Sequence, residues 1–331
     1  MVTQQQFLDF LTEIEPSTST VAASSSAHRT LRSALKDEKE FGKFHVDTFL
    51  SGSYKRNTAI RPAKIDGVLQ RPDVDIIVET NHTEEDLPKT VLSLLHKGLK
   101  DAGYENLTVN RRSVAVSLVT VDMDVVPVIA DGDTFLIPDV ELKKWVATNP
   151  NGHTDWTTSI NTSAEGRFKP LVKLVKWWRR LHLSDLKRPK GFILECLVAR
   201  HMSYQKKNYE DLLVELLESV RDAYQWDVDN GKVPFLEDPS VPGSNVFSNV
   251  TAGEFKRFHS KVKAFAKTAR AAKDEVNADK SLSAWRGVLG GLFPAAGSKK
   301  AEAATLVQSA LGVGLTFPSH AVVPNKPAGF A

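Results

Sequence analysis

The chain has a single cysteine, Cys196, among its 331 residues. An internal disulfide is therefore excluded, and because Cys196 lies in an apolar stretch we expect a buried structural thiol. The nine histidines show no tight Cys/His spacing of the kind that zinc sites need. A disulfide scaffold and a zinc-organised domain are both excluded, and the cytoplasm is the expected compartment.

Long hydrophobic runs and a large excess of charge are also missing. No apolar run approaches the roughly 20 residues of a membrane span, and the N-terminus lacks the apolar centre of a signal peptide. Lys and Arg number 43 against 40 Asp and Glu, a formal net charge of +3. This mild charge neither requires nor excludes nucleic acid. We expect a protein without a membrane partner, long enough for one bilobed unit or two domains.

The chain does have acids placed in apolar, strand-like runs. Asp73 and Asp75 flank Val74 at the start of one run, and Asp124 lies within another, residues 121–127. Side chains alternate across a strand, so Asp73 and Asp75 project to one side, about 6.5–7 Å apart along the backbone. An Asp from a neighbouring strand would complete the cluster. Because acids in apolar strands seldom lack a partner or a metal, the pattern favours a metal site over a polar outer face.

A Gly-Ser pair, Gly52-Ser53, follows the strand predicted for residues 46–51. Glycine lets a backbone approach a phosphate closely, and the Ser53 hydroxyl and nearby amides can donate hydrogen bonds to it. Two divalent ions about 3.5–4 Å apart stabilise the attacking and leaving oxygens of phosphoryl transfer. Magnesium prefers such oxygen ligands, and manganese is an alternative. The combination predicts phosphoryl transfer with two Mg²⁺ ions.

These segments together resemble a known superfamily. Residues 49–60, 73–78 and 124–127 resemble the polymerase-β-like nucleotidyltransferases, and most of all the bacterial CD-NTases, relatives of cyclic GMP-AMP synthase and oligoadenylate synthase. The similarity extends to residues 173–178 and 191–195. It implies an α+β fold that is bilobed, with a mixed or antiparallel catalytic sheet, helices around it and a C-terminal helical lobe.

The resemblance also implies a reaction. NTPs, ATP or GTP above all, would be condensed into a cyclic di- or trinucleotide second messenger with release of pyrophosphate. Asp73, Asp75 and Asp124 would be both the catalytic residues and the metal ligands. The product would activate a separate effector protein in CBASS antiphage defence. Asp122 competes with Asp124, since the two face the same way, but Asp124 lies deeper in the apolar run and in the string that resembles the family.

Further residues are assigned to the nucleotide by resemblance. Gly52 and Ser53 would bind its phosphates, and Lys176 would contact the triphosphate, with Lys173, three residues away on the same helix face, as a second candidate. Phe192 occupies the position of a base-stacking aromatic, although core packing is equally compatible with it. At Gly191 the family often carries a polar residue, so Lys190 or a backbone amide would have to replace that hydrogen bond.

We predict three parts: a catalytic core with N-terminal helices over residues 1–165, a helical lobe over 166–315 and a flexible tail over 316–331. By resemblance, a ubiquitin-transfer-like enzyme would join the tail to targets; a frayed terminus is the alternative. No counterpart of the zinc-bearing DNA-binding insertion of cyclic GMP-AMP synthase is present, so we expect no DNA requirement. We also expect a monomer.

Three other functions compete with this interpretation. The first is a linear product, either oligoadenylate or a nucleotide added to an RNA end. The second is a non-catalytic scaffold that binds nucleotide, and the third is nucleotidyl transfer to a small molecule of the aminoglycoside type. Base choice, ring size and the 2′–5′ or 3′–5′ linkage depend on pocket positions that sequence patterns do not locate.

The periodicity of apolar residues predicts the other elements. The residues 227–249 are rich in Pro, Gly, Asn and Asp and are typical of a long surface loop. Helices are predicted over 3–14, 28–40, from 83–86 onward, 169–183, 191–202, 209–224, 251–273 and 278–289, and strands over 107–110, 115–119 and 123–129.

Overall fold

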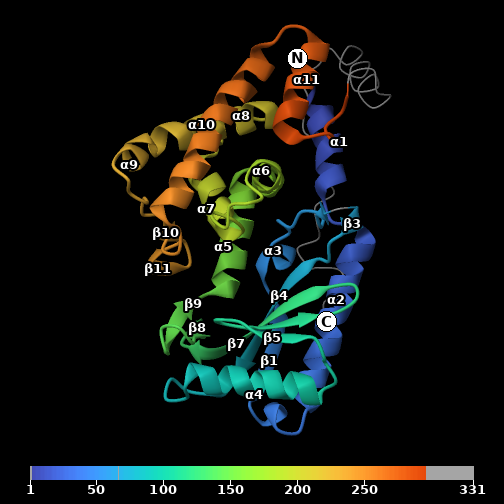
Figure 1. Ribbon diagram of the computed structural model, residues 1–331, viewed down its shortest axis with the longest axis vertical. Helices are drawn as coiled ribbons and strands as arrows, with labels where there is room; N and C mark the ends of the chain where they lie inside the picture. Colours follow the sequence, from blue (N-terminus) through green and yellow to red (C-terminus); the bar gives the residue numbers. More distant parts are fainter. Residues whose placement is uncertain (1, 66, 296–331) are drawn as a thin grey trace.

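The computed structural model describes residues 2–65 and 67–295, which form a sheet lobe and a helical lobe (Figure 1). The predicted tail, 316–331, and the last part of the predicted helical lobe lie outside the described residues. Among the described helices, none combines the length and the apolar character that crossing a bilayer requires.

The sheet lobe is built on one mixed sheet, as predicted. Its main path runs β1-β4-β7-β6-β5, with β8 and β9 extending from β7. β4 and β7 are parallel and every other pair is antiparallel. The strands are β1 (His45–Leu50), β4 (Asp73–Thr80), β5 (Leu107–Val109), β6 (Val114–Ser117), β7 (Asp122–Asp131), β8 (Thr134–Asp139) and β9 (Lys144–Thr148).

Two helices, α2 (Thr18–Asp37) and α4 (Pro88–Asp101), pack on this sheet. Leu31 and Leu35 of α2 and Leu95 of α4 share one buried core with the apolar side chains of β4. α2 starts ten residues earlier than the helix predicted from position 28. Ser17 caps its N-terminus, and Ser24 donates its hydroxyl to a carbonyl four residues back, so the Ser/Thr-rich stretch is satisfied within a helix.

The helical lobe contains most of the remaining helices and a second, larger core. The N-terminal helix α1 packs here, with Phe7 edge-on to Trp285 and Phe293 at 5.1 Å between ring centroids. The predicted division of the chain at residue 165 stays a prediction. The packing shows in addition that α1, at the N-terminus, belongs to the core of the helical lobe. The helices are α1 (Gln4–Ile14), α5 (Pro150–Ser163), α6 (Phe168–His182), α7 (Phe192–His201), α8 (Tyr209–Ala223), α9 (Gln225–Asp229), α10 (Ala252–Asp274) and α11 (Ala278–Leu289).

Short elements complete the chain. Two segments differ from the prediction: residues 83–86 and residues 227–249. Residues 83–86 form a turn closed by Asp86, and the helix begins only at Pro88, because proline suits the first helical turn. The predicted loop 227–249 holds a small hairpin of β10 and β11. The short elements are η1 (Phe41–Lys43), α3 (Gly52–Lys55), β2 (Lys64–Ile65), β3 (Val68–Leu69), β10 (Glu237–Asp238) and β11 (Val241–Asn245).

A buried ion network joins the two lobes. Glu195 of α7 accepts hydrogen bonds from Arg56 at 3.0 Å, from Thr58 at 2.9 Å and from Lys176 of α6 at 2.8 Å. The Glu195 side chain is fully buried. Burial alone would raise the pKa of Glu195, but Lys176 and Arg56 beside it lower that pKa to about 2. Arg56 and Thr58 follow α3, so the network fixes the Gly-Ser turn against the helical lobe.

Replacing Glu195 with alanine should therefore destabilise the protein strongly. The change leaves two cations buried without their anion, which costs about 3–5 kcal/mol of unfolding free energy. Urea denaturation of the purified protein measures the loss. Asp101→Ala is the matched control, because its ion pair with Lys97 at 2.9 Å is exposed to solvent, which screens it, and should contribute little to stability. Similar losses for the two variants would contradict the structural role of the network.

Candidate active site

Four aspartates share one face of the sheet at the start of β4 and β7. Alternation along β4 puts Asp73 and Asp75 on the same side. The parallel register pairs Asp73 with Asp122 and Asp75 with Asp124. Directly paired residues of neighbouring strands point to the same face, so the four carboxyl groups form two rows. The sequence pattern predicted this shared face for Asp73, Asp75 and an acid of the next strand.

The acids repel one another. Burial first, and then the charges of Asp73 and Asp124, raise the pKa of Asp75 to about 6. The pKa of Asp73 is also raised, first by burial and then by Asp124, against the opposing charge of Lys190. Carboxylates that raise one another's pKa in this way favour a cation between them.

Asp124 fits the third ligand position better than Asp122. Asp122 accepts a hydrogen bond from Arg71 Nε at 3.0 Å and so already has a cationic partner. The charge of Asp124 is among the main causes that raise the pKa of Asp75, after burial and Asp73. The Asp124 oxygen Oδ1 is buried without a hydrogen-bond partner, as is Oδ1 of Asp122. An orphaned carboxylate oxygen of this kind suits a hard cation such as Mg²⁺.

As the side chains stand, however, the described residues contain no group of three acids, histidines or cysteines spaced to share one ion. The Asp75 carboxylate lies instead against the Gly-Ser turn. A Cβ built on Gly52 would fall 1.7 Å from Asp75 Oδ2, and Gly52 has a φ of +65°. The amide of Ser51 donates to the carbonyl of Asp75 at 2.9 Å, which ties the turn to β4. Close approach and backbone conformation both require glycine at position 52.

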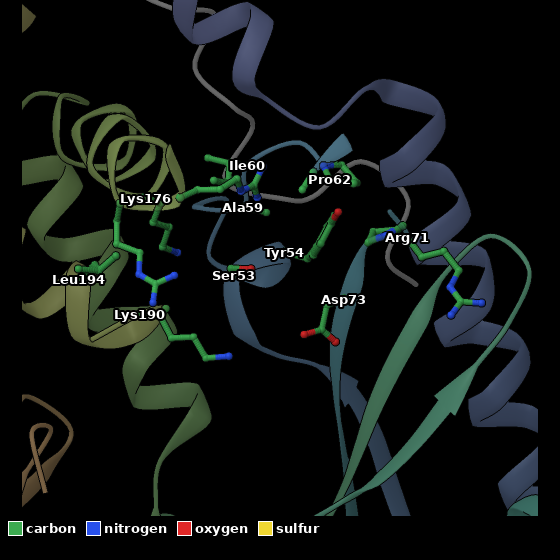
Figure 2. Close-up of a pocket in the computed structure, with 15 residues that line it drawn as sticks. Ser53, Tyr54, Ala59, Ile60, Pro62, Arg71, Asp73, Lys176, Lys190 and Leu194 are labelled. Atoms are coloured by element: carbon green, nitrogen blue, oxygen red, sulfur yellow. The ribbon is translucent and has the colours of Figure 1, made fainter. Parts of the chain in front are cut away.

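A cavity of about 310 Å³ opens between the acids and the helical lobe. In Figure 2 Asp73 and Ser53 reach it from the sheet lobe, and Lys176 and Lys190 from the helical lobe. Cationic side chains outnumber acids in its wall, which suits a polyphosphate. The lining residues are Ser53, Tyr54, Ala59, Ile60, Pro62, Ala63, Arg71, Pro72, Asp73, Lys176, Arg179, Arg180, Lys190, Gly191 and Leu194.

The two lysines predicted to bind nucleotide differ in position. Lys176 lines the cavity, but its ammonium group is buried and donates to Glu195 and to Thr58. Lys173 is not in the cavity wall; it donates to Glu15 at 2.7 Å. The role of either lysine at the triphosphate stays a prediction, and Lys176 is the better placed of the two.

Phe192 lies beside the cavity rather than in its wall. Its ring packs against His153, with centroids 4.3 Å apart, and against Trp156 at 5.7 Å. The Arg56 guanidinium lies over the ring at 5.0 Å. Phe192 therefore has the packed surroundings of a core aromatic, the alternative that the sequence left open. Base stacking on this ring stays a prediction.

Several cavity residues have no motif in the sequence. Lys190 was expected only as a substitute hydrogen-bond donor, yet it extends into the cavity toward Asp73 (Figure 2). No hydrogen bond or ion pair of Lys190 is found within residues 2–65 and 67–295. Arg71, Arg180 and Tyr54 were not anticipated. They come from three separate elements, so only the tertiary fold brings them together, and burial raises the pKa of Tyr54 to about 12.

Gly52→Ala should abolish activity and lower stability. The added methyl group would collide with the Asp75 carboxylate, and a displacement of about 1 Å at such a site can cost a hundredfold in rate. Gly132→Ala is the matched control, because Gly132 has a similar φ of +56° but nothing within 4 Å of its Cβ position. Both variants lose about 1–2 kcal/mol to backbone strain. If Gly132→Ala loses activity equally, the contact with Asp75 is not the reason for glycine.

Asp75→Asn should abolish activity and stabilise the metal-free fold at high pH. The folded-state pKa of about 6 lies above the ordinary value of 3.8 for an aspartate, so the charged form is penalised above that pH and the penalty disappears as Asp75 protonates on acidification. The variant should gain about 1–3 kcal/mol near pH 8 and little near pH 4. Urea denaturation with a chelator at both pH values measures this. Asp131→Asn, an exposed acid on β7, serves as control; a pH-independent gain would count against repulsion.

Two relatives named as cyclic oligonucleotide synthases align with this chain along its full length. The Second Messenger Oligonucleotide or Dinucleotide Synthetase domain family matches residues 1–161. A cyclic AMP-AMP-AMP synthase of Acinetobacter sp. is 61% identical, over 100% of this chain and 98% of the relative. A cyclic AMP-AMP-GMP synthase of Enterobacter hormaechei is 27% identical, over 100% of both chains.

Solved structures agree with the fold. The E. coli MS115-1 CdnC structure with ATP has a TM-score of 0.69 at 19% identity, covering 88% of this chain and 99% of that one. The Bradyrhizobium diazoefficiens CD-NTase CdnG with GTP has a TM-score of 0.71 at 12% identity, covering 92% and 97%. The polymerase-β-like fold predicted from the sequence is thereby confirmed. With the identity to the Acinetobacter synthase, the conclusion is that the chain belongs to the CD-NTase family of bacterial cyclic oligonucleotide synthases.

Proposed function

We propose that this enzyme condenses three molecules of ATP into cyclic AMP-AMP-AMP, with release of three pyrophosphates. The observation that carries the chemistry is the group of acids on one face of β4 and β7, of which Asp73 lines a cavity with a cationic wall. The product is inferred from the relative that is 61% identical, which is named for cyclic AMP-AMP-AMP.

The acids are proposed to hold two Mg²⁺ ions, for which Mn²⁺ would substitute. Asp73 and Asp75 would contact both ions, and Asp124, with its orphaned oxygen, the one nearer the attacking hydroxyl. When bound, the ions lower the pKa of that hydroxyl and neutralise charge on the phosphates. Gly52 leaves room for the Asp75 carboxylate beside the Gly-Ser turn. The proposed metal ligand and the amides proposed to bind phosphate therefore lie next to each other.

Each bond forms by an in-line displacement at phosphorus. The hydroxyl oxygen of the acceptor nucleotide bonds to the α-phosphorus of the donor, and its proton leaves to water. The bond from the α-phosphorus to the oxygen that bridges to the β-phosphate breaks, and that oxygen departs with the pyrophosphate. Because negative charge develops on the leaving group, fixed positive groups near it lower the barrier.

Lys190 and Ser53 are proposed to hold the donor triphosphate from opposite walls. The Lys190 ammonium has no partner within the described residues, so its charge remains available to a ligand. The ammonium of Lys176 is fixed by Glu195 and Thr58, and it would act through its position and field rather than as a mobile ligand. Lys173, paired with Glu15, would support the helix that carries Lys176.

The biological setting is proposed from the family. The second messenger would activate a separate effector protein in CBASS antiphage defence, in the bacterial cytoplasm where NTPs are made. A ubiquitin-transfer-like partner acting on residues 316–331 remains a proposal on a segment outside the described residues.

A product that contains GMP is the second candidate, because a relative 27% identical over the whole chain is named for cyclic AMP-AMP-GMP. The two candidates differ in one measurable property. An enzyme specific for ATP forms product from ATP alone, whereas the second candidate requires GTP as well.

Incubation of the purified protein with ATP and Mg²⁺, followed by mass spectrometry, should give a cyclic trinucleotide that phosphatase leaves intact. Linear oligoadenylates, which phosphatase shortens, would overturn cyclisation. Asp124→Asn should reduce the rate at least about a thousandfold, as expected for loss of transition-state stabilisation of about 4 kcal/mol. Asp122→Asn is the matched variant and should lose far less. The opposite ranking would make Asp122 the third metal ligand.

A further inference from the structure

Arg71 lies at the sheet-lobe edge of the cavity, two residues before Asp73. Its Nε donates to Asp122 Oδ2 at 3.0 Å and its Nη1 donates to the carbonyl of Leu118 at 2.8 Å. Its side chain is 42% exposed. A guanidinium has five N–H donors. Within the described residues no hydrogen bond engages Nη2, so the guanidinium is held through Nε and Nη1 and keeps the N–H donors of Nη2 for a ligand.

The segment that carries Arg71 is fixed. The amide of Asp122 donates to the carbonyl of Pro72 at 2.9 Å, which ties the residue after Arg71 to the first residue of β7. Asp122 is only partly exposed, and its second oxygen, Oδ1, is buried without a partner. The carboxylate therefore orients the arginine and leaves its positive charge near the row of acids.

Arg71 lies over different strands of the sheet than the other cationic side chains of the cavity. The sheet order is β1-β4-β7-β6, with the Gly-Ser turn following β1. Arg71 contacts Asp122 at the start of β7 and Leu118 just after β6. In Figure 2 it lies beyond Asp73, on the side away from Lys190. Lys190 and Ser53 thus face one side of β4, and Arg71 faces the other.

The proposed reaction needs phosphate-binding groups for the donor nucleotide and, separately, for the acceptor nucleotide. The donor's α-phosphate must lie near the Gly-Ser turn, and the attacking hydroxyl must lie near Asp124 on β7. The acceptor is therefore over β7 and β6. When the acceptor is an NTP or a linear intermediate, it still carries its own triphosphate, which no donor-side group can reach at the same time. A guanidinium suits that group because it stays charged, and the Nη2 of Arg71 can donate to phosphate oxygens while Nε and Nη1 keep their bonds to Asp122 and Leu118.

We propose that Arg71, oriented by Asp122, binds the 5′-triphosphate of the acceptor and so makes a triphosphorylated nucleotide the preferred acceptor. This inference rests on the proposed function. It assigns Arg71 to acceptor selection and Asp122 to positioning, and it gives the fourth acid of the row a role distinct from that of Asp73, Asp75 and Asp124.

The test separates the acceptor from the donor. The donor is 2′,3′-dideoxy-ATP, which has no hydroxyl with which to attack, and the competing acceptors are ATP, AMP and adenosine. Mass spectrometry counts only products that end in the dideoxy nucleotide. The wild-type enzyme should prefer ATP to adenosine, and Arg71→Ala should reduce that ratio about 10- to 100-fold, the usual range for losing a hydrogen bond to a charged group. Arg71→Lys should keep part of it.

The matched control is Arg32→Ala. Arg32 makes a comparable exposed ion pair, with Asp47 at 2.7 Å, between α2 and β1. Its removal should leave the acceptor ratio unchanged. The inference is overturned if Arg71→Ala keeps the wild-type ratio, or if it lowers the rates with ATP and adenosine equally, which would indicate a structural role. If the wild-type enzyme makes no dideoxy-terminated product with any acceptor, the proposed function itself fails, and this inference with it.

Discussion

Repulsion among carboxylates on two parallel strands is the constraint on which the site depends. The register of β4 and β7 puts Asp73, Asp75, Asp122 and Asp124 on one face, and the pKa of Asp75 rises to about 6 as a result of burial and of its neighbours' charges. Such an arrangement destabilises the fold by itself. It persists because the two strands are central in the sheet and their other faces are buried among apolar side chains of α2 and α4. The binding of cations would relieve the repulsion. The same carboxylates that destabilise the empty site would therefore be the ones that hold the metal ions.

The second constraint is the buried Glu195, which explains why the cationic wall stands opposite the acids. Arg56 and Thr58 come from the segment after the Gly-Ser turn, and Lys176 from α6, so one carboxylate fixes both sides of the cavity. Lys176 then has two effects. Its ammonium is neutralised locally by Glu195, but its field still lowers the pKa of Asp75. A lysine at this position contributes to the site even without touching a phosphate, which is why its resemblance to the family motif could not distinguish a lysine that binds phosphate from one that acts through its field.

The sequence predicted what depends on local pattern. The helix over 278–289 agrees at both ends with α11, and the apolar run that contains Asp124 became β7, because both have strong periodicity. The first ten residues of α2, the strands β8 and β9 and the packing of α1 in the helical lobe were missed, since tertiary contacts rather than propensity decide them. The same holds for the site. The acids lie on strands and could be placed on a common face, whereas Lys190, Arg180 and Arg71 come from separate segments that only the fold brings to one cavity.

Cyclisation would require the 5′-triphosphate of the linear intermediate to be bound first as part of the acceptor and later as the donor. Arg71 is suited to the first of these states. During chain growth the 5′-triphosphate of the linear intermediate belongs to the acceptor, so it would lie over β7 and β6 beside Arg71. At ring closure the same triphosphate would become the donor, and it would have to move to Ser53 and Lys190, the proposed donor site. Arg71 must therefore release it without leaving a bare guanidinium beside the acids. Because Asp122 already holds Arg71 Nε, the arginine keeps a partner when the phosphate departs. A strong, fully buried phosphate clamp at this position would instead hold the intermediate and slow closure, so the partial exposure of Arg71 fits the proposed cyclisation.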